Sequence, residues 1–462
     1  LANQSPIYSI SEKAINSVYG SIELSYNDVL YLTGTARQDW FSTLSNIAVD
    51  DEDNAILYPS VSASFIFSDA FEMPSWLTFG KIRGSWAQVG GDTDPYNLAL
   101  TYGLVGQGHL GNPLGRIAQG RIPNANLVPL SNTEVEIGVD LRLLKNRLGI
   151  DFAYYDRKTE DDILFASVSQ TSGYGSQVVN VGEVTNNGIE LLITGTPVRT
   201  NDLTWEVTFN LAKNNSNVSS LLDPENDDLA GTDQAENLRV AEARSRNAYI
   251  HHIEGFPYSA IMGFRYVRDA SGNIQLDDNG LPMQGDFGVL GVGVHDLTGG
   301  INNTIRYKEL SLSFLLDFKS GGDIYSGTNR TAYGAGLHMK TLEGRESGTV
   351  TLADGQTTTL APNDVQDYWS RVASITEEFV YDASFLKLRQ LTLSYSLPRS
   401  IIGNTPFTRA SVAFVGRNLW LISSNVDNID PEATYDNGNG QGLEWYGVPQ
   451  TRTFGFDLNL SF

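Results

Sequence analysis

The last ten residues of the chain alternate between apolar and polar side chains without interruption. The apolar members of this segment are Phe454, Phe456, Leu458, Leu460 and Phe462. Successive side chains of a β-strand point to opposite faces, so this segment has one wholly apolar face and one polar face. Such a strand fits a boundary between an apolar and a polar environment.

The same two-faced pattern recurs along the chain in segments of about ten residues, the length that a tilted strand needs to cross a bilayer. In residues 134–143, Val135 and Ile137 alternate with Glu134 and Glu136. An unpaired carboxylate in a dry core is strongly unfavourable, so the polar faces predict a water-filled lumen. The predicted fold class is all-β, a transmembrane antiparallel β-barrel.

Composition agrees with strands rather than helices. Apolar residues make up 41% of the chain and no uninterrupted apolar stretch approaches about eighteen residues, which excludes a helical membrane protein. Only alternate residues of a barrel strand face lipid, so a mean hydropathy of -0.21 is compatible with a membrane protein. The 45 Gly, 21 Tyr and 20 Phe favour strands, turns and aromatic girdles.

Charge and cysteine content limit the ligands. A net charge of -23 disfavours nucleic acid as a partner and makes neutral or cationic cargo the better expectation, although solvated loops account for most of the acidic residues. The chain has no Cys, which excludes disulfides and thiolate metal sites and suits an oxidising periplasm.

Reading the alternation predicts about thirteen strands joined by connections that are short and long in turn. The predicted strands are residues 14–26, 30–41, 58–67, 79–89, 132–143, 148–157, 187–197, 203–214, 296–307, 309–319, 384–397, 408–421 and 452–462. The predicted long loops are residues 42–57, 90–131, 158–186, 215–295, 320–382 and 422–451. This alternation is typical of a barrel with short periplasmic turns and long external loops.

Two details of the pattern predict local features of the sheet. Leu386 and Leu388 are in one phase and Leu391 and Leu393 in the other, which predicts a β-bulge near residues 389–390.

An odd number of strands leaves open edges, which are costly in lipid. The N-terminus carries neither Met nor an export signal, so we expect residues 1–462 to be the C-terminal portion of a longer barrel, which should not fold alone.

Several phrases of the chain carry a family resemblance. They are SFLKLRQLTLSYSLP at 384–398, VAFVGRNLW at 412–420, DPE at 430–432, YPSVSASFIFSDAF at 58–71, KIRGSWAQVGG at 81–91, NRLGIDFAYYDRKTEDDIL at 146–164, NNGIELLITGTPV at 186–198 and YGVPQTRTFGFDLNLSF at 446–462. In this order they resemble the SusC/RagA family of TonB-dependent outer-membrane transporters, across essentially the whole chain.

The resemblance implies a barrel of about 22 strands in the cell outer membrane, closed by an N-terminal barrel and plug portion. It implies energisation by the TonB–ExbB–ExbD complex, contact with outer-membrane lipid, a SusD-like lipoprotein lid and a possible dimer of transporter–lid pairs. The implied function is active import of a large nutrient, an oligosaccharide or an oligopeptide, without enzyme activity. The alternatives are a passive porin-like channel or a structural surface protein; an outer-membrane hydrolase is disfavoured by the five His.

Aromatic residues of the long loops, with polar neighbours, are the candidate substrate contacts, because sugar rings stack on aromatic faces and amides or carboxylates bind hydroxyls. The predicted contacts are Tyr96, Tyr174, Tyr435, Asp436, Asn437, Glu444, Trp445 and Tyr446. They could equally pack the loops together or contact a lid. Trp40, Trp76 and Trp205, near strand ends, fit interfacial girdles better.

Other motifs support no chemistry. The GxGxxG match at residues 106–111 lacks a βαβ context, since Pro113 follows it. His251 and His252 are adjacent, so in a strand they point apart and make a poor metal pair. The family resemblance suggests a Ca²⁺ loop before residue 296, but residues 269–273 and 277–280 match it only in part. No catalytic residue, metal or cofactor is therefore predicted, apart from a possible loop Ca²⁺.

Overall fold

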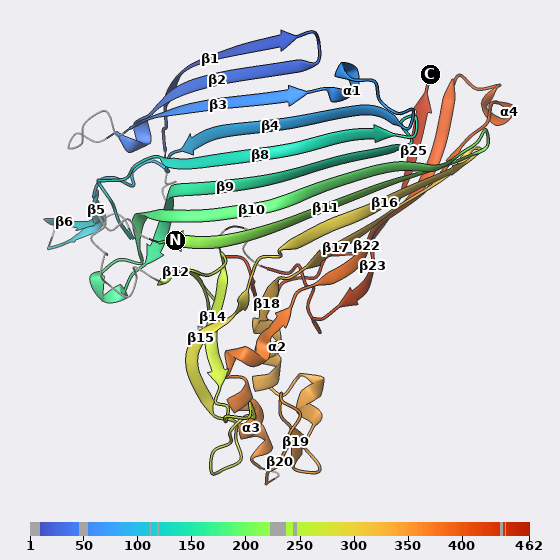
Figure 1. The fold of residues 1–462 in the computed structure, drawn as a ribbon. Coiled ribbons are helices and arrows are strands. Elements are labelled where there is room, and N and C mark those ends of the chain that lie inside the picture. Colours follow the sequence, from blue (N-terminus) through green and yellow to red (C-terminus); the bar gives the residue numbers. More distant parts are fainter. Residues whose placement is uncertain are drawn as a thin grey trace.

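A computed structural model describes residues 10–45, 54–110, 112–117, 120–221, 237–243, 247–361, 363–434, 438 and 440–462. Its main feature is a 14-stranded sheet in which thirteen strands follow one antiparallel path, and β7 (Arg121–Ile122) pairs beside this path with β10 (Figure 1). The path runs β1 (Ile15–Tyr26), β2 (Leu30–Phe41), β3 (Ala55–Phe65), β4 (Leu77–Gly91), β8 (Leu130–Leu143), β9 (Leu148–Ser167), β10 (Ser176–Arg199), β11 (Leu203–Ser220), β16 (Leu297–Tyr307), β17 (Leu310–Ser320), β22 (Phe385–Ser396), β23 (Arg409–Ser424) and β25 (Thr453–Ser461). The thirteen predicted strands and their antiparallel pairing are confirmed.

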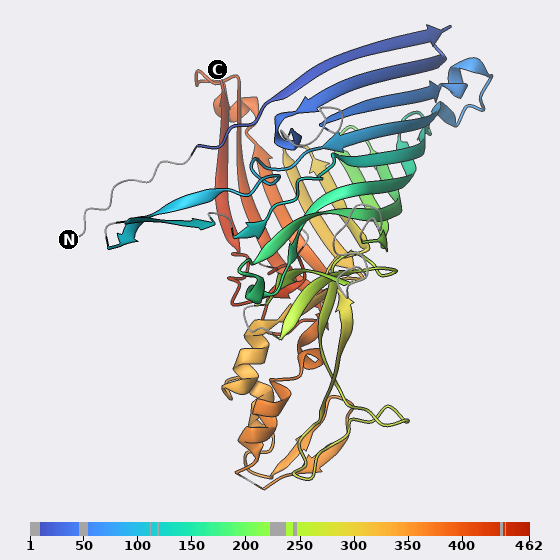
Figure 2. The same ribbon diagram turned by 90° about the vertical axis from the view of Figure 1, so that its left-hand side faces the viewer.

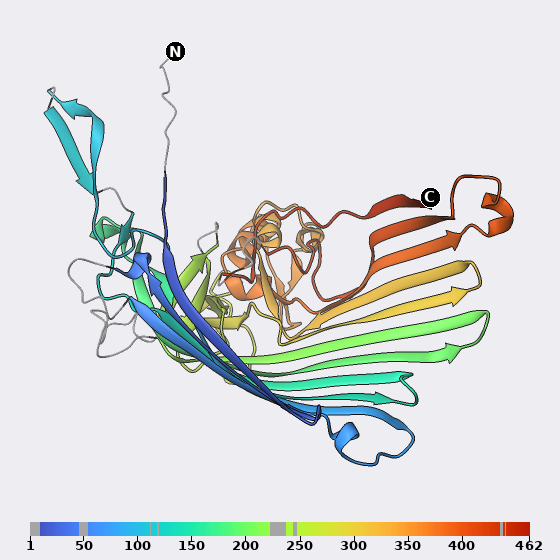
Figure 3. The ribbon, with the colours of Figure 1, turned by 90° about the horizontal axis from the view of Figure 1, so that it is seen from above.

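The sheet is an open arc. Figure 3, which looks along the arc from above, shows its two ends apart, with β1 at one end and β25 at the other. Within the described residues each of these edge strands pairs with a single neighbour, β2 or β23. An edge strand in lipid leaves backbone groups unpaired, so the arc needs further strands to close.

Short connections lie at one end of the arc, on the right in Figure 1. Three of them contain residues with positive φ, among them Asn27 at 51°, Lys145 at 59° and Lys308 at 51°. Left-handed residues give tight hairpin turns whose twist matches that of the strands. The long connections leave from the opposite end, as the alternation of loop lengths predicts.

The two faces of the sheet have the character that the sequence predicts. Apolar side chains of the outward face are open to the surroundings, Phe456 being 83% and Ile22 68% exposed. The inward face carries hydrogen-bonded polar groups; the Arg83 guanidinium, for example, contacts Glu136 at 3.1 Å and Asp151 at 2.8 Å. An exposed apolar band with a polar opposite face is the arrangement of a barrel wall between lipid and water.

The predicted β-bulge is present. Leu315 and Leu316 of β17 face Gln390 and Leu388, which leaves Arg389 as the extra residue on β22. The extra residue restores the outward direction of the leucines on both sides of it. It also turns the Arg389 side chain inward, where the guanidinium contacts Asp317.

Several strands are longer than the sequence predicts. Residues 158–186, predicted to be a long loop, are mostly the continuation of β9 and β10, which pair as far as Ser167 and Ser176. The prediction was wrong because the apolar alternation ends where Lys158 and Glu160 appear on the outward face, whereas backbone pairing does not depend on apolar side chains. These strands therefore extend beyond the apolar band.

The long connections also contain ordered structure, which the alternation pattern does not predict. Residues 215–295 contribute a four-stranded sheet of β12 (Asn237–Glu242), β13 (Ala248–Ile253), β14 (Ala260–Tyr266) and β15 (Gln284–Val292). Other connections contain a three-stranded sheet of β21 (Val380–Asp382), β18 (Asp323–Ser326) and β24 (Leu443–Glu444), and the pairs β19 (Thr349–Thr351) with β20 (Thr357–Thr359) and β5 (Tyr102–His109) with β6 (Asn112–Ile117). The GxGxxG match therefore falls at the β5–β6 hairpin, with Gly111 outside the described residues.

Helices are short. They are α1 (Phe67–Ala70), α2 (Gly327–Gly334), α3 (Val365–Val372) and α4 (Arg399–Ile402), with 3-10 turns η1 (Ser42–Leu44), η2 (Gln170–Ser172), η3 (Met339–Leu342) and η4 (Thr376–Phe379). None of the helices in the described part of the chain has the length and apolar character to cross a membrane.

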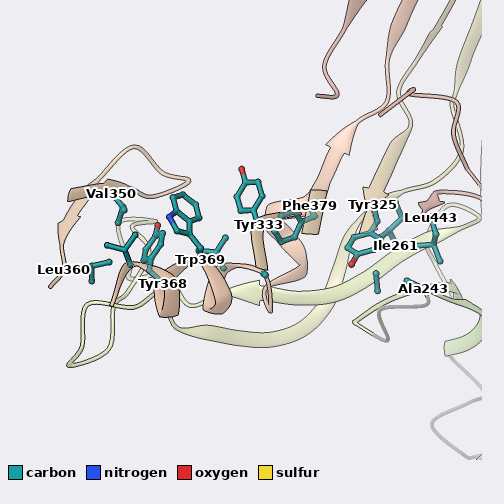
Figure 4. Close-up of a cluster of buried hydrophobic side chains, with 14 of the residues drawn as sticks. Ala243, Ile261, Tyr325, Tyr333, Val350, Leu360, Tyr368, Trp369, Phe379 and Leu443 are labelled. Atoms are coloured by element: carbon teal, nitrogen blue, oxygen red, sulfur yellow. The ribbon is translucent and has the colours of Figure 1, made fainter. Parts of the chain in front are cut away.

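Parts of residues 248–292 and 323–382 pack into a lobe that projects from the sheet, at the bottom of Figures 1 and 2. Its core contains a cluster of aromatic side chains from α2, α3 and η4, which Figure 4 shows. The Tyr333 ring packs edge-on against Phe379 at 5.0 Å and Trp369 at 5.4 Å. Edge-to-face pairs add to the stability that burial provides, so the lobe has a hydrophobic core of its own.

Candidate functional site

A polar pocket of about 230 Å³ lies on the inward face of the wall, where β9, β10 and β11 rise beyond the apolar band. Its lining residues are Thr159, Asp162, Val184, Asn186, Asn214, Ser216, Tyr258, Val294 and Gln441. The strand residues among them come from positions that pair across the sheet, such as Asn186 with Ser216. Amides and hydroxyls that converge on one pocket are the groups that bind polar, neutral ligands.

Hydrogen bonds hold this lining in place. The Asn214 amide donates to the Asn186 side-chain oxygen at 3.3 Å, and the Tyr155 hydroxyl donates to the Asn214 side-chain oxygen at 2.9 Å. The Tyr258 backbone N–H donates to the Ser216 hydroxyl at 3.2 Å. The pocket is therefore largely preformed, which lowers the entropic cost of binding.

Tyr258 is held from behind by a buried histidine. The His252 ring is 1% exposed and stacks on the Tyr258 ring with the centroids 4.0 Å apart. Burial lowers the pKa of His252 to about 4, so the ring is neutral at neutral pH. The neighbouring His251 instead contacts Tyr249 and Phe287, so the two histidines point apart as predicted.

The pocket contains one carboxylate. Asp162 follows Asp161, whose φ of 58° breaks the regular strand, and it lines the pocket beside Thr159. Among the described residues, Asp162 forms no ion pair. The pocket is thus able to accept a cationic group as well as neutral hydroxyls and amides.

The connection that supplies Gln441 is fastened to the wall by an ionic cluster. The Lys387 ammonium lies 2.7 Å from Asp430 and 2.8 Å from Glu432, and Arg389 contacts Glu432 at 2.9 Å. Burial alone would raise the pKa of Glu432, but the hydrogen bonds from Arg389 and Lys387 lower it to about 2. This cluster, Lys387, Arg389, Asp430 and Glu432, is called the wall anchor below.

Glu444 lies inside its connection rather than on its surface. Its carboxylate accepts hydrogen bonds from the Ser326 hydroxyl at 2.9 Å, from the Thr328 hydroxyl at 2.5 Å and from the Gly447 N–H at 3.0 Å. The residue is fully buried, so in this conformation it shapes the connection and offers no free oxygen to a ligand.

Trp445 and Tyr446 lie next to each other at the end of the same connection. Their rings meet edge-on at 4.9 Å, and Trp445 packs so closely over Gly327 that a Cβ there would lie 2.1 Å from the indole. Tyr446 is 54% exposed, so of the pair it offers the more accessible ring. A contact between either ring and a substrate stays a prediction.

The other predicted contacts are spread over separate places. Tyr96 is exposed and lines a second pocket of about 270 Å³ with Asn97 and Arg121. Tyr174 is half-buried at the turn between β9 and β10, where its backbone N–H donates to Ser172. The predicted contacts Tyr435, Asp436 and Asn437 lie outside the described residues.

The residues of the polar pocket were not predicted from the sequence, because inward Asn and Ser side chains look like ordinary lumen positions. A usable signal was present in the two Asn doublets, residues 186–187 and 214–215. In the structure Asn186 and Asn214 come together at the pocket, where the Asn214 amide donates to the Asn186 side-chain oxygen at 3.3 Å. Asn187 and Asn215 pair on the opposite face of the sheet. Such amide pairs next to a loop mark a site for hydrogen-bonded ligands.

No group of three or more potential metal ligands occurs among the residues that the structure describes. The Asp269 carboxylate accepts hydrogen bonds from the backbone of Ser271 and Asn273, and Asp277 accepts from Asn279 and Leu281. Both aspartates thereby form local turns. A loop Ca²⁺ stays an untested prediction.

The chain matches the family model described as TonB dependent receptor-like, beta-barrel, over residues 2–317. It is 28% identical to TonB-dependent receptor P3 of Formosa agariphila over 98% of this chain and 46% of that protein. It is 22% identical to TonB-dependent receptor SusC of Bacteroides thetaiotaomicron over 83% of this chain and 37% of that protein. The chain thus spans about half the length of the curated relatives it matches.

Among solved structures, the RagAB peptide importer in its closed-closed state is similar, with a TM-score of 0.76 and 18% identity over 99% of this chain and 49% of that one. The open-open state of the same importer has a TM-score of 0.74. At this identity the likeness concerns the fold, and it agrees with the thirteen-strand path described above. The chain belongs to the TonB-dependent receptor-like β-barrel family.

Proposed function

We propose that this chain forms part of the barrel of a SusC/RagA-type transporter of the outer membrane that imports a large nutrient, an oligosaccharide or an oligopeptide. The observation that carries the proposal is the preformed polar pocket on the inward wall, behind an outward band of exposed apolar side chains. Uptake of this kind requires binding and a shift between conformations, not covalent chemistry, so we expect no enzyme activity.

A lid partner of the SusD-like kind is part of the proposal. The projecting lobe exposes two large apolar side chains, Leu337 and Met339, each 82% open. Leu337 precedes η3 by two residues and Met339 is its first residue, in the lobe and outside the apolar band. Exposed apolar side chains that are not needed for lipid contact are typical of protein-binding surfaces. Energisation by TonB with ExbB and ExbD is the companion proposal.

The proposal is tested by uptake in cells that lack the gene and carry variants of the natural full-length protein. Asn214→Leu removes an amide from the pocket and leaves the Tyr155 hydroxyl without its acceptor. We expect about tenfold weaker uptake of the cognate oligomer, the effect of one unsatisfied polar group. Asn210→Leu, on the same face of β11 but outside the pocket, is the matched control and should have little effect.

Three outcomes separate this function from its alternatives. Loss of uptake on deletion of the gene, together with loss when the proton-motive force is dissipated, supports active import. Uptake that survives dissipation would instead indicate a passive porin-like channel. Normal uptake of every oligosaccharide and oligopeptide after deletion would contradict import and favour a structural role.

A further inference from the structure

A second groove lies far from the polar pocket, at the short-turn end of the sheet. It has a volume of about 710 Å³ and is lined by Ser75, Trp76, Leu144, Lys145, Arg147, Leu148, Gly195, Thr196 and Pro197. Leu148 and Gly195 are direct partners in the register of β9 and β10, and both occupy outward positions. The groove therefore begins in the apolar band and ends at the rim formed by the short turns.

The groove is cationic. It contains Lys145 and Arg147 and no acidic side chain among its lining residues, all of which the structure describes. The Arg147 guanidinium donates to the backbone oxygens of Thr196 and Pro197, which are neutral and leave its charge uncompensated. Lys145 has no ion-pair partner in the described parts of the chain.

The opposite end of β9 and β10, next to the long loops, carries a lysine whose charge is compensated. There the Lys158 ammonium lies 2.8 Å from Glu160 and 2.8 Å from Glu183, so its charge is compensated twice. At the groove, by contrast, no carboxylate of a described residue compensates Lys145 and Arg147, which lie beside the apolar surface of Leu148. The groove thus combines cationic side chains, which attract a phosphate, with an apolar surface, which an acyl chain can cover.

Trp76 completes the groove. Its side chain is 54% exposed at the rim, and its backbone oxygen accepts a hydrogen bond of 2.7 Å from the Leu144 N–H, which fixes the two turns together. Tryptophan prefers the headgroup level of a bilayer, where the indole ring contacts acyl carbons and its N–H contacts polar groups. The groove floor at Gly195 is open, since a Cβ there would meet only Pro197, at 4.0 Å.

We infer that this groove binds one glycerophospholipid of the periplasmic leaflet, with the phosphate at Lys145 and Arg147 and an acyl chain along Leu148 and Gly195. The inference rests on the barrel orientation of the proposed function, in which the short turns are periplasmic, and not on the imported cargo. The apolar floor, continuous with the outward band, selects a lipid over a free phosphate ion.

The test is native mass spectrometry of the natural full-length protein with added phosphatidylglycerol. Lys145→Asn removes the charge and suits a residue whose φ is 59°. We expect about fivefold lower retention of the lipid, the effect of one cation at a phosphate. Gly195→Leu keeps both cations but fills the floor, and we expect it to abolish retention.

Lys308→Asn is the matched control, because Lys308 has a φ of 51° in another short turn of the same rim and lies outside the groove. Retention of one lipid by the unaltered protein and by this control, with losses in the two groove variants, supports the inference. Equal retention in all four proteins overturns it, and so does release of the lipid by an excess of inorganic phosphate. If only the polar pocket binds cargo, uptake of cargo stays normal in the groove variants. A failure of this lipid test can therefore be distinguished from a failure of the uptake test.

Discussion

The ammonium of Lys387 on β22 and the carboxylate of Glu432 are 2.8 Å apart, although 45 residues separate them in the chain. Both are largely buried, with 7% and 14% of their side chains exposed. The pair fastens the connection that follows β23 to the inward wall, and the same connection supplies Gln441 to the polar pocket.

Replacing this lysine should loosen the connection. Lys387→Met leaves the buried Asp430 carboxylate without its ion-pair partner, while Glu432 keeps Arg389 and Lys319. We expect a loss of about 3 kcal/mol in the free energy of unfolding, because an unpaired buried charge is strongly unfavourable. Lys158→Met, which breaks exposed ion pairs, should cost less than about 1 kcal/mol. Unfolding in lipid vesicles measures both, and equal losses would contradict the role of the wall anchor.

The wall anchor should also respond to acid. The pKa of Glu432 is about 2 in the folded protein, below the 4.5 of a free glutamate, so its contribution to stability is complete above pH 4.5 and is lost as pH falls toward 2. The hydrogen-exchange protection factors of residues 425–434, which correct for the intrinsic pH dependence of exchange, should therefore stay high from pH 7 to 4.5 and fall below it. Glu432→Gln should remove this dependence; an unchanged profile in that variant would contradict the assignment.

His252 should produce a separate dependence at milder pH. Its folded pKa of about 4 lies below the ordinary 6.5, so the unfolded chain binds the extra proton and stability falls as pH decreases from 6.5 to 4. His252→Phe keeps the stack on Tyr258 and should make the melting temperature less dependent on pH in this window. Tyr258→Phe, which changes no group that titrates there, should leave the slope as it is, and an unaltered slope in His252→Phe would refute the argument.

Deletions in β22 test the bulge. Removing Arg389 takes out the extra residue and leaves Leu388 and Leu391 in the same outward alternation, so we expect assembly to persist. Removing Thr392 instead turns Leu393 and Tyr395 toward the lumen, and assembly should fail. The fraction of protein that is folded in the outer membrane, from heat-dependent gel mobility, distinguishes the two; equal fractions would contradict the register.

The core of the lobe can be weakened without disturbing the sheet. Trp369→Ala removes a ring that packs on Tyr333 and Tyr368, at a cost of about 4 kcal/mol. We expect protease cleavage within residues 323–382 while the barrel still assembles. Leu337→Ala, at an exposed position of the lobe, is the control and should leave cleavage unchanged. Loss of barrel assembly in Trp369→Ala would show that the lobe is not an independent unit.

The membrane-facing part of the fold was predictable because one physical contrast, lipid against water, acts on every second residue. Even the bulge at Arg389 follows from the phase of the leucines around it. The prediction was wrong at the outer ends of β9 and β10, where backbone hydrogen bonds continue after the contrast has ended. The lobe was missed as well, although Val365, Tyr368, Trp369 and Val372 have the spacing of a helix face.

The candidate site was less predictable, because it depends on contacts between distant segments. Glu444 is buried by Ser326, which is 118 residues away, and no local pattern reveals that contact. The Asn186 and Asn214 side chains meet only because β10 and β11 pair in one register. The sequence can therefore suggest which chemistry the loop aromatics offer, but it does not place them in space, and their contact with a substrate stays a prediction.

The separate aromatic core of the lobe has a consequence for how such proteins diversify. A region that carries its own buried cluster can exchange surface residues, or accept insertions, without altering the strand register that the lipid imposes on the wall. The surface of the lobe and the membrane fit of the wall can then change independently during evolution, each under its own selection.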